Sequence, residues 1–148
     1  MPTIDSTVLI NAPLERVYAI AQDNRSFPDF MDDVKSLTVL EEDGPRIVSE
    51  WHGVIPAFGL KIKWTQEDLW DHDKHRCAFT QIKGDYDAMA GYWEFRAEAD
   101  GVTRFDSHVE YEYNVPALGA LVKKVVHNLA TKNVEGLLNA IKKRAEAE

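Results

Sequence analysis

The chain has 148 residues, of which 45% are hydrophobic and 28% charged, so we expect one domain over residues 1–148 with a substantial core. Its net charge of −8 disfavours nucleic-acid partners and weakens attraction to anionic membranes. The only cysteine, Cys77, forms no internal disulfide, no apolar run approaches the ~18 residues of a membrane span and the start lacks a signal-peptide pattern, so we expect a cytoplasmic protein.

The first part of the chain predicts one strand and two short helices. Residues 7–10 are apolar or β-branched and predict a strand. Pro13 suits the first turn of a helix and opens a helical pattern that runs to Gln22. Residues 26–29, Ser-Phe-Pro-Asp, form a start signal of the capping-box type, which predicts a second helix over residues 26–34.

The middle of the chain, from Val34 to Val115, predicts six antiparallel strands. Apolar and polar residues alternate there, and turn signals at 42–45, 71–75, 84–87 and 100–101 separate the runs. The clearest alternating row consists of Leu60, Ile62, Trp64, Gln66, Asp68 and Trp70, opposed by Lys61, Lys63, Thr65 and Glu67. We expect the first row to face the interior and the second to face solvent.

A long amphipathic helix is expected from Pro116 to the end of the chain. Its apolar residues recur every three or four positions and are Leu118, Leu121, Val122, Val125, Val126, Leu129, Leu137 and Ile141. One helix of this length has to cover the whole sheet. The fold expected is therefore α+β, a curved antiparallel sheet wrapped around a long C-terminal helix in the order β-α-α-β6-α.

This helix-grip order resembles the START-like superfamily, also called SRPBCC. The resemblance is closer to its polyketide cyclase/dehydrase and lipid-transport branch, which includes coenzyme-Q-binding proteins. It is carried by residues 10–18, 23–30, 91–93 and 101–103 and by the helix from Pro116. It implies a site for hydrophobic small molecules between the sheet and the last helix. Some members are cyclases and many have no known reaction, so the fold does not by itself assign a function.

Polar and aromatic side chains share the inner face of the predicted sheet. A buried polar group without a partner costs roughly 1–3 kcal/mol, which a ligand- or water-filled cavity would offset. The alternative explanation of these polar residues is that they lie at solvent-exposed strand ends. Asn133 of the last helix could point its amide into the cavity, and a hydrogen bond to neighbouring backbone is an equal alternative. We expect the ligand-binding wall to consist of Trp51, Trp64, Phe79, Gln81, Trp93, Phe105, Ser107, Tyr111 and Asn133.

Catalytic and metal-binding motifs are missing from the sequence. It has no HExxH, paired-cysteine, GxSxG or P-loop pattern, so we expect no metal and no cofactor. Asp68 is a weak catalytic candidate, because burial would raise the pKa of its carboxyl group and suit it to general acid or base catalysis. Tyr111 is a second weak candidate. Cys77 lies in an apolar strand and is expected to be a buried, inert thiol.

The connection from Gly53 to Gly59 is unusual because it is almost wholly apolar, whereas loops normally lie on the surface. We expect Ile55 and Phe58 to form a gate over the cavity. A dimer contact, a membrane-touching tip, or an ordinary core hairpin packed against Phe27 and Phe30 are the alternatives.

Three functions are compatible with these patterns. The leading one is binding or transport of a hydrophobic small molecule, namely a lipid, an isoprenoid or an aromatic polyketide-like compound. The alternative is a cyclase or dehydratase acting in the same cavity, and the third is a protein-interaction module using the apolar connection and a sheet edge. The expected protein is a monomer or homodimer without a transmembrane segment, although transient membrane contact is allowed.

Overall fold

A computed structural model describes residues 2–32, 34–55, 60–113 and 120–147. The chain order of elements is β1 (Thr3–Ile10), α1 (Leu14–Gln22), a 3-10 turn η1 (Asn24–Ser26), α2 (Phe27–Phe30), β2 (Val34–Asp43), β3 (Arg46–Ile55), β4 (Leu60–Asp71), β5 (Arg76–Gly84), β6 (Ala88–Ala99), β7 (Val102–Glu112) and α3 (Ala120–Glu146). This is the predicted helix-grip order of one strand, two short helices, six strands and a long helix.

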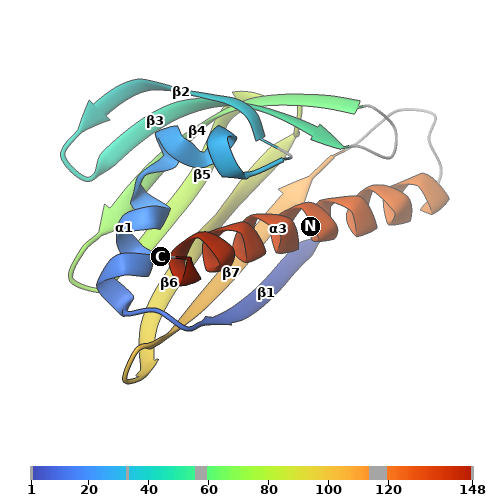
Figure 1. The fold of residues 1–148 in the computed structure, drawn as a ribbon. Coiled ribbons are helices and arrows are strands. Elements are labelled where there is room, and N and C mark those ends of the chain that lie inside the picture. Colours follow the sequence, from blue (N-terminus) through green and yellow to red (C-terminus); the bar gives the residue numbers. More distant parts are fainter. Residues whose placement is uncertain (1, 33, 56–59, 114–119, 148) are drawn as a thin grey trace.

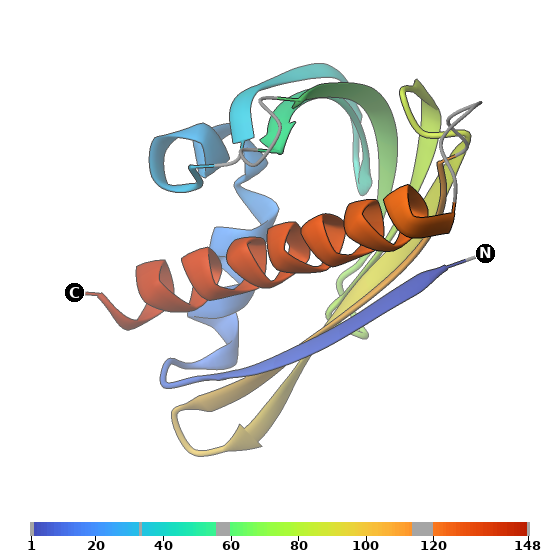
Figure 2. The ribbon, with the colours of Figure 1, turned by 90° about the vertical axis from the view of Figure 1, so that its right-hand side faces the viewer.

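The strands form one antiparallel sheet in the order β1-β7-β6-β5-β4-β3-β2. The first strand of the chain returns to pair with the last, so β1 and β2 are the two edges. The sheet curls strongly, and α3 runs along its concave side (Figures 1 and 2). The short helices α1 and α2 lie at the end of the sheet where α3 ends (Figure 1).

Strand register aligns the inward-facing side chains across the sheet. Trp51 of β3 lies opposite Trp64 of β4, and Asp68 lies opposite Phe79 of β5. Because side chains alternate between the two faces of a strand, all of these point toward α3. The concave face therefore combines the aromatic and polar residues that the alternating pattern predicted to be interior.

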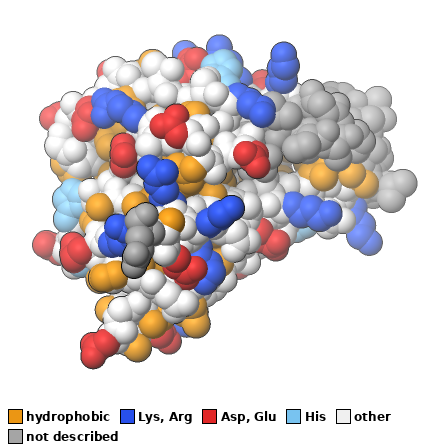
Figure 3. All heavy atoms as spheres, viewed as in Figure 1, with side chains coloured by type: hydrophobic (Ala, Val, Ile, Leu, Met, Phe, Trp, Pro, Cys, Tyr) orange, Lys and Arg blue, Asp and Glu red, His pale blue; other side chains and the backbone are white. Residues whose placement is uncertain are grey.

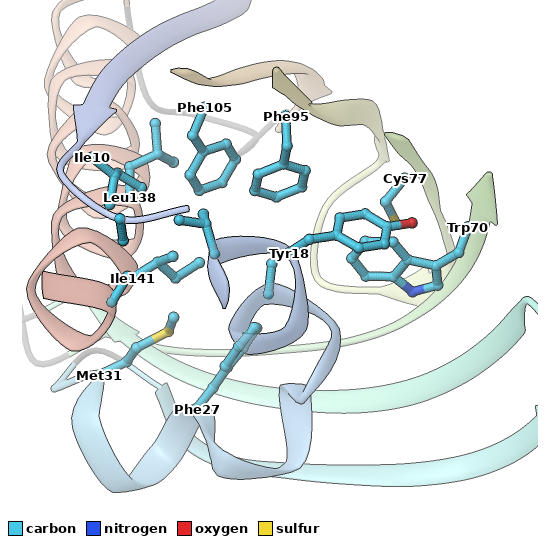
Figure 4. Packing of buried hydrophobic residues seen from close by; sticks show 14 of the residues in the cluster. Ile10, Tyr18, Phe27, Met31, Trp70, Cys77, Phe95, Phe105, Leu138 and Ile141 are labelled. Carbon is cyan, nitrogen blue, oxygen red and sulfur yellow. The ribbon is translucent and has the colours of Figure 1, made fainter. Parts of the chain in front are cut away.

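A cluster of buried hydrophobic side chains lies between the sheet, α1 and the last turns of α3. Ile10, Phe105, Leu138 and Ile141 are fully buried there, and Figure 4 shows them converging with Phe27. Phe95 stacks on Phe105 with ring centroids 4.4 Å apart. Burying side chains of this size stabilises the fold by roughly 1.5–3 kcal/mol each, so this cluster anchors one end of the helix to the sheet.

Hydrogen bonds also hold the C-terminal end of α3. Arg16 Nε of α1 donates to the backbone oxygen of Ala145 at 2.7 Å, and Lys142 Nζ donates to the backbone oxygen of Leu9 at 2.6 Å. The last carbonyl groups of a helix have no partner within the helix, so Arg16 satisfies one of them. The opposite part of α3 is less buried: Val125, Val126 and Leu129 are all partly exposed.

Three sequence-based predictions are corrected. The second helix was expected over residues 26–34, but α2 ends at Phe30, since Met31 is extended (φ −112°, ψ 110°) and Val34 already pairs in the sheet. Ser26 does not cap it: its hydroxyl donates to the backbone oxygen of Asp23. On α3 the fully buried positions include Leu138, which the predicted stripe passed over in favour of Leu137. The predicted start at Pro116 lies outside the described residues.

The convex face of the sheet carries charged side chains in cross-strand pairs. Arg46 bonds to Glu67 at 2.7 Å and Arg76 to Glu94 at 3.2 Å. Such exposed pairs contribute little to stability. Figure 3 shows another side of the molecule, the one with the C-terminal end of α3, where charged side chains of both signs are also scattered. Among the described helices, none is long and apolar enough to cross a membrane.

Candidate functional site: a cavity between the sheet and α3

A cavity lies between the concave face of the sheet and α3. Its volume is about 110 Å³, measured as the space open to the centres of water-sized molecules. One water molecule requires roughly 10–15 Å³ on the same measure, so the cavity is several times larger. The helical side of its wall consists of Ala130, Asn133, Val134, Leu137 and Leu138. Ala21, Asn24 and Phe27 contribute from the α1–α2 end. The space is therefore large enough for a molecule of many atoms.

Aromatic rings dominate the sheet side of the cavity. Trp51 and Trp64 stack with ring centroids 5.5 Å apart and planes inclined by 12°. Phe79 meets Trp93 edge to face at 6.4 Å. The indole Nε1–H of Trp51 donates to Ser49 Oγ at 2.9 Å, so this ring's polar edge is satisfied within the wall. The wall therefore presents flat apolar surfaces, which suit an apolar and especially an aromatic ligand.

A row of polar side chains crosses this apolar wall along β4. Trp64 Nε1 donates to Gln66 Oε1 and Gln66 Nε2 donates to Asp68 Oδ1, both at 2.8 Å. The first bond fixes the orientation of the Gln66 amide, so that its NH₂ group faces Asp68. Asp68 is only 5% exposed, and desolvation raises the pKa of its carboxyl group to about 7. The carboxyl group thus changes charge near neutral pH inside the cavity.

Two tyrosines line the cavity beyond this polar row. Tyr111 Oη lies 2.8 Å from Nδ1 of His127 on α3, and the two rings stack 5.9 Å apart. Burial raises the pKa of Tyr111, and it raises the pKa of Tyr86 to about 12. Both phenols are therefore protonated at neutral pH. Within the described chain Tyr111 joins β7 to α3 across one side of the cavity.

Most of the predicted wall residues do line the cavity, namely Trp51, Trp64, Phe79, Trp93, Ser107, Tyr111 and Asn133. Gln81 and Phe105 do not. Gln81 Nε2 donates to the backbone oxygen of Tyr86 at 2.9 Å, which places the amide in the turn before β6. Phe105 belongs to the packed core against Phe95. The weak catalytic candidates Asp68 and Tyr111 both line the cavity.

The predicted gate is only partly within the described chain. Gly53 and Ile55 are part of β3, and Ile55 pairs with Leu60 of β4, so β3 extends into the connection predicted over residues 53–59 while β4 begins at Leu60, as the alternating pattern predicted. Phe58 lies outside the described residues. Gly53 lines the cavity together with Ile62.

Some lining residues were missed or weighed too low. Trp70 and Gln66 lie on the same face as Trp64, so the alternation along β4 was a signal that could have included them in the wall. Tyr86 lies in a turn and Asn24 in a 3-10 turn, where no periodic pattern shows which way a side chain points. Cys77 lines the cavity as a buried thiol whose pKa is raised by burial, as expected of an inert cysteine.

The chemistry of the cavity depends on a few polar side chains. The part of the chain that the structure describes contains no group of three or more His, Cys, Asp or Glu side chains placed to hold a metal ion. What the cavity can do is desolvate an apolar molecule, bind a polar group of that molecule, and exchange a proton at Asp68.

Comparison with known proteins was consistent with this geometry. The family model described as "Polyketide cyclase / dehydrase and lipid transport" matches residues 10–138. The crystal structure of TTHA0849 from Thermus thermophilus is 35% identical, covers 97% of both chains and superposes with a TM-score of 0.91.

Two more distant similarities have named roles. The Zhui aromatase/cyclase from Streptomyces sp. R1128 superposes with a TM-score of 0.89 at 19% identity, over 98% of this chain and 93% of that chain, which shows a shared fold. The ribosome association toxin RatA of Escherichia coli strain K12 is 22% identical over 135 residues, which is 91% of this chain and 84% of RatA.

Proposed function

Because this chain belongs to the polyketide cyclase/dehydrase and lipid-transport family, we propose that it binds and carries a hydrophobic small molecule in the cavity between the sheet and α3. The observation that carries the proposal is the wall itself. Stacked and tilted aromatic rings surround a space of about 110 Å³, and polar groups are confined to a few positions. That combination is typical of small-molecule sites.

The chemistry of the wall favours one class of ligand, namely an apolar molecule that contains rings or is isoprenoid-like. Trp51, Trp64 and Trp93 offer ring faces and edges, while Val134 and Leu137 of α3 close the opposite side. Transfer of apolar surface from water to such a wall contributes roughly 25 cal/mol per Å² before the costs of binding.

The test combines ligand detection with a cavity-filling variant. Native mass spectrometry of freshly purified protein should reveal an extractable apolar compound. An apolar fluorescent dye should quench tryptophan emission, because indole rings line the site. Ser107→Leu should weaken dye binding by about tenfold or more, since its side chain enters the cavity and Ser107 Oγ has no hydrogen-bond partner among the described residues.

Gln81→Leu is the matched control. It also replaces a polar side chain by leucine on a neighbouring part of the sheet, but Gln81 does not line the cavity. The dye affinity of this variant should equal that of the wild type. Equal affinity for wild type and Ser107→Leu, with both folded, would contradict binding in this cavity.

A reaction in the same cavity is a second candidate function, favoured by one observation. Asp68 lines the cavity, and its carboxyl pKa is raised to about 7 by desolvation, which suits a general acid or base at neutral pH. A cyclase or dehydratase of this kind would convert a polyketide-like substrate with a rate that changes near pH 7. Asp68→Asn would abolish that conversion while leaving substrate binding measurable.

A further inference from the structure

Two unused hydrogen-bonding groups lie side by side on β4. Asp68 is 5% exposed, and the hydrogen bond found for its carboxyl group among the described residues is at Oδ1, which accepts from Gln66 Nε2. Trp70 Nε1 is a buried donor without a partner within the described chain. Both residues line the cavity. A buried donor without a partner, next to a carboxylate that accepts at only one of its oxygens, indicates what a ligand's polar group has to supply.

The spacing of these residues suits a single bridging atom. Asp68 and Trp70 are two positions apart on one strand, so their side chains leave the same face about 7 Å apart at the backbone. A hydroxyl oxygen makes hydrogen bonds of about 2.8 Å in each direction and spans roughly 5–6 Å between donor and acceptor. Such an oxygen would accept from Trp70 and donate to Asp68.

Carbonyl, ether and ammonium groups each satisfy only one of the two. A ketone or ether oxygen accepts from Trp70 but gives an ionised Asp68 no proton. An ammonium group donates to Asp68 but has no lone pair for Trp70. A hydroxyl group serves both with one atom, because its oxygen accepts while its hydrogen is donated.

We propose that the cavity selects apolar molecules that carry a hydroxyl group, phenolic or alcoholic, whose oxygen accepts from Trp70 Nε1 and donates to Asp68 Oδ2. This assignment rests on the proposed function, because it specifies the ligand of the same cavity. It gives the apolar wall a means of discriminating between ligands of equal hydrophobicity, since a buried polar pair left without a partner disfavours the analogue that lacks the hydroxyl.

Affinity for such a ligand should depend on pH through Asp68. A hydrogen-bond donor prefers the ionised carboxylate, so binding weakens as pH falls through the pKa of about 7. The other titratable groups lining the described cavity are Cys77, Tyr86 and Tyr111, and burial raises the pKa of each. None of these becomes charged between pH 5.5 and 8.5. The residues paired with Asp68 from β3 and β5, Ile47 and Phe79, are uncharged.

The experiment uses two probes that differ by one hydrogen-bond donor, 2-naphthol and 2-methoxynaphthalene. Dissociation constants are measured by tryptophan fluorescence at pH 5.5 and 8.5, where a phenol remains protonated. The wild type should bind 2-naphthol more tightly at pH 8.5, by up to roughly 30-fold if only the ionised form of Asp68 binds it. Affinity for 2-methoxynaphthalene should be unchanged or should fall as pH rises.

Asp68→Asn should remove the pH dependence and the preference for 2-naphthol, while Asp100→Asn, an equal charge change in an exposed turn, should keep both. Equal pH profiles for the two probes in the wild type would overturn the hydroxyl assignment but leave ligand binding in the cavity intact. If folded Asp68→Asn still preferred 2-naphthol, the hydroxyl assignment would likewise be overturned and ligand binding in the cavity would stay intact. Failure of both probes to bind the wild type would count against the assignment and the proposed function together.

Discussion

Asp68 shows at the scale of one residue how the cavity and the stability of the protein are connected. The carboxyl group is buried among apolar side chains, and the donor from Gln66 offsets only part of the cost of removing its charge from water. The pKa of Asp68 in the folded protein is therefore about 7, against about 3.9 for an unfolded chain. Folding favours the protonated acid, so a proton is bound more tightly by the native state than by the unfolded one.

This difference predicts a falling stability as pH rises. Between about pH 4 and 7 the native state holds a proton that the unfolded state has released, so the free energy of unfolding decreases across that interval and levels off above it. Asp68→Asn should remove this effect and stabilise the protein at pH 8 by up to about 4 kcal/mol. Urea denaturation of both proteins at pH 4.5 and pH 8 measures the change, with Asp100→Asn as the control. If Asp68→Asn raised the free energy of unfolding by the same amount at both pH values, the prediction would be contradicted.

At the scale of the element, β6 depends on a residue without a side chain. Gly91 pairs with Phe79 of β5 and Val109 of β7. A Cβ atom at this position would lie 2.0 Å from the backbone oxygen of His108 and 2.8 Å from Cζ of Phe79. Backbone of a paired strand has little freedom to move, so the close approach of the strands requires glycine here.

Gly91→Ala should therefore destabilise the protein by roughly 3 kcal/mol, because neighbouring strands have to separate. Gly101→Ala is the comparison. That glycine has a φ of +71° but open space around it, so only the backbone conformation is unfavourable and the expected loss is about 1 kcal/mol. Thermal and urea unfolding give both values. A loss at Gly91 no larger than at Gly101 would show that the strands accommodate the methyl group.

At the scale of the whole molecule, α3 is the cover of both the core and the cavity. Leu138 and Ile141 are fully buried against the sheet, and Ala130, Asn133 and Val134 close the cavity. No other described helix runs along the concave face, as the two views of the ribbon show (Figures 1 and 2). The sheet by itself would expose the whole aromatic row to water.

Truncation after Val115 should therefore leave no folded domain. Loss of the fully buried Leu138 and Ile141, at roughly 1.5–3 kcal/mol each, removes a large part of the 5–15 kcal/mol that stabilises a typical domain. Exposure of the concave face that α3 covers adds to this loss. The truncated chain should show no cooperative thermal transition and no dispersed NMR spectrum, while the full chain shows both. A cooperative transition in the truncated chain would mean that the sheet does not need the helix.

The sequence by itself determined the order of elements and, at most positions, which face of each strand is interior. These features follow from local rules: side chains alternate on a strand, helical spacing is close to four residues, and Gly44 and Gly101 mark turns with a positive φ. Thr65, which was predicted to face solvent, is buried, next to an irregularity in the pairing of β4 with β5. The alternation on β4 was sufficient to group Trp64, Gln66 and Asp68 on one face. It is also why most of the predicted wall residues line the cavity.

Tertiary structure alone decided which interior residues border empty space and which are packed solid. Phe105 and Ser107 have the same parity on β7, yet Phe105 is packed against Phe95 whereas Ser107 faces the cavity. The difference depends on the distance between the sheet and α3. Phe105 lies in the cluster where the fully buried Leu138 and Ile141 pack the helix against the sheet (Figure 4), whereas at Ser107 the cavity separates them. Parity along one strand contains no information on that distance, because it is set by curvature and packing of elements far apart in the chain.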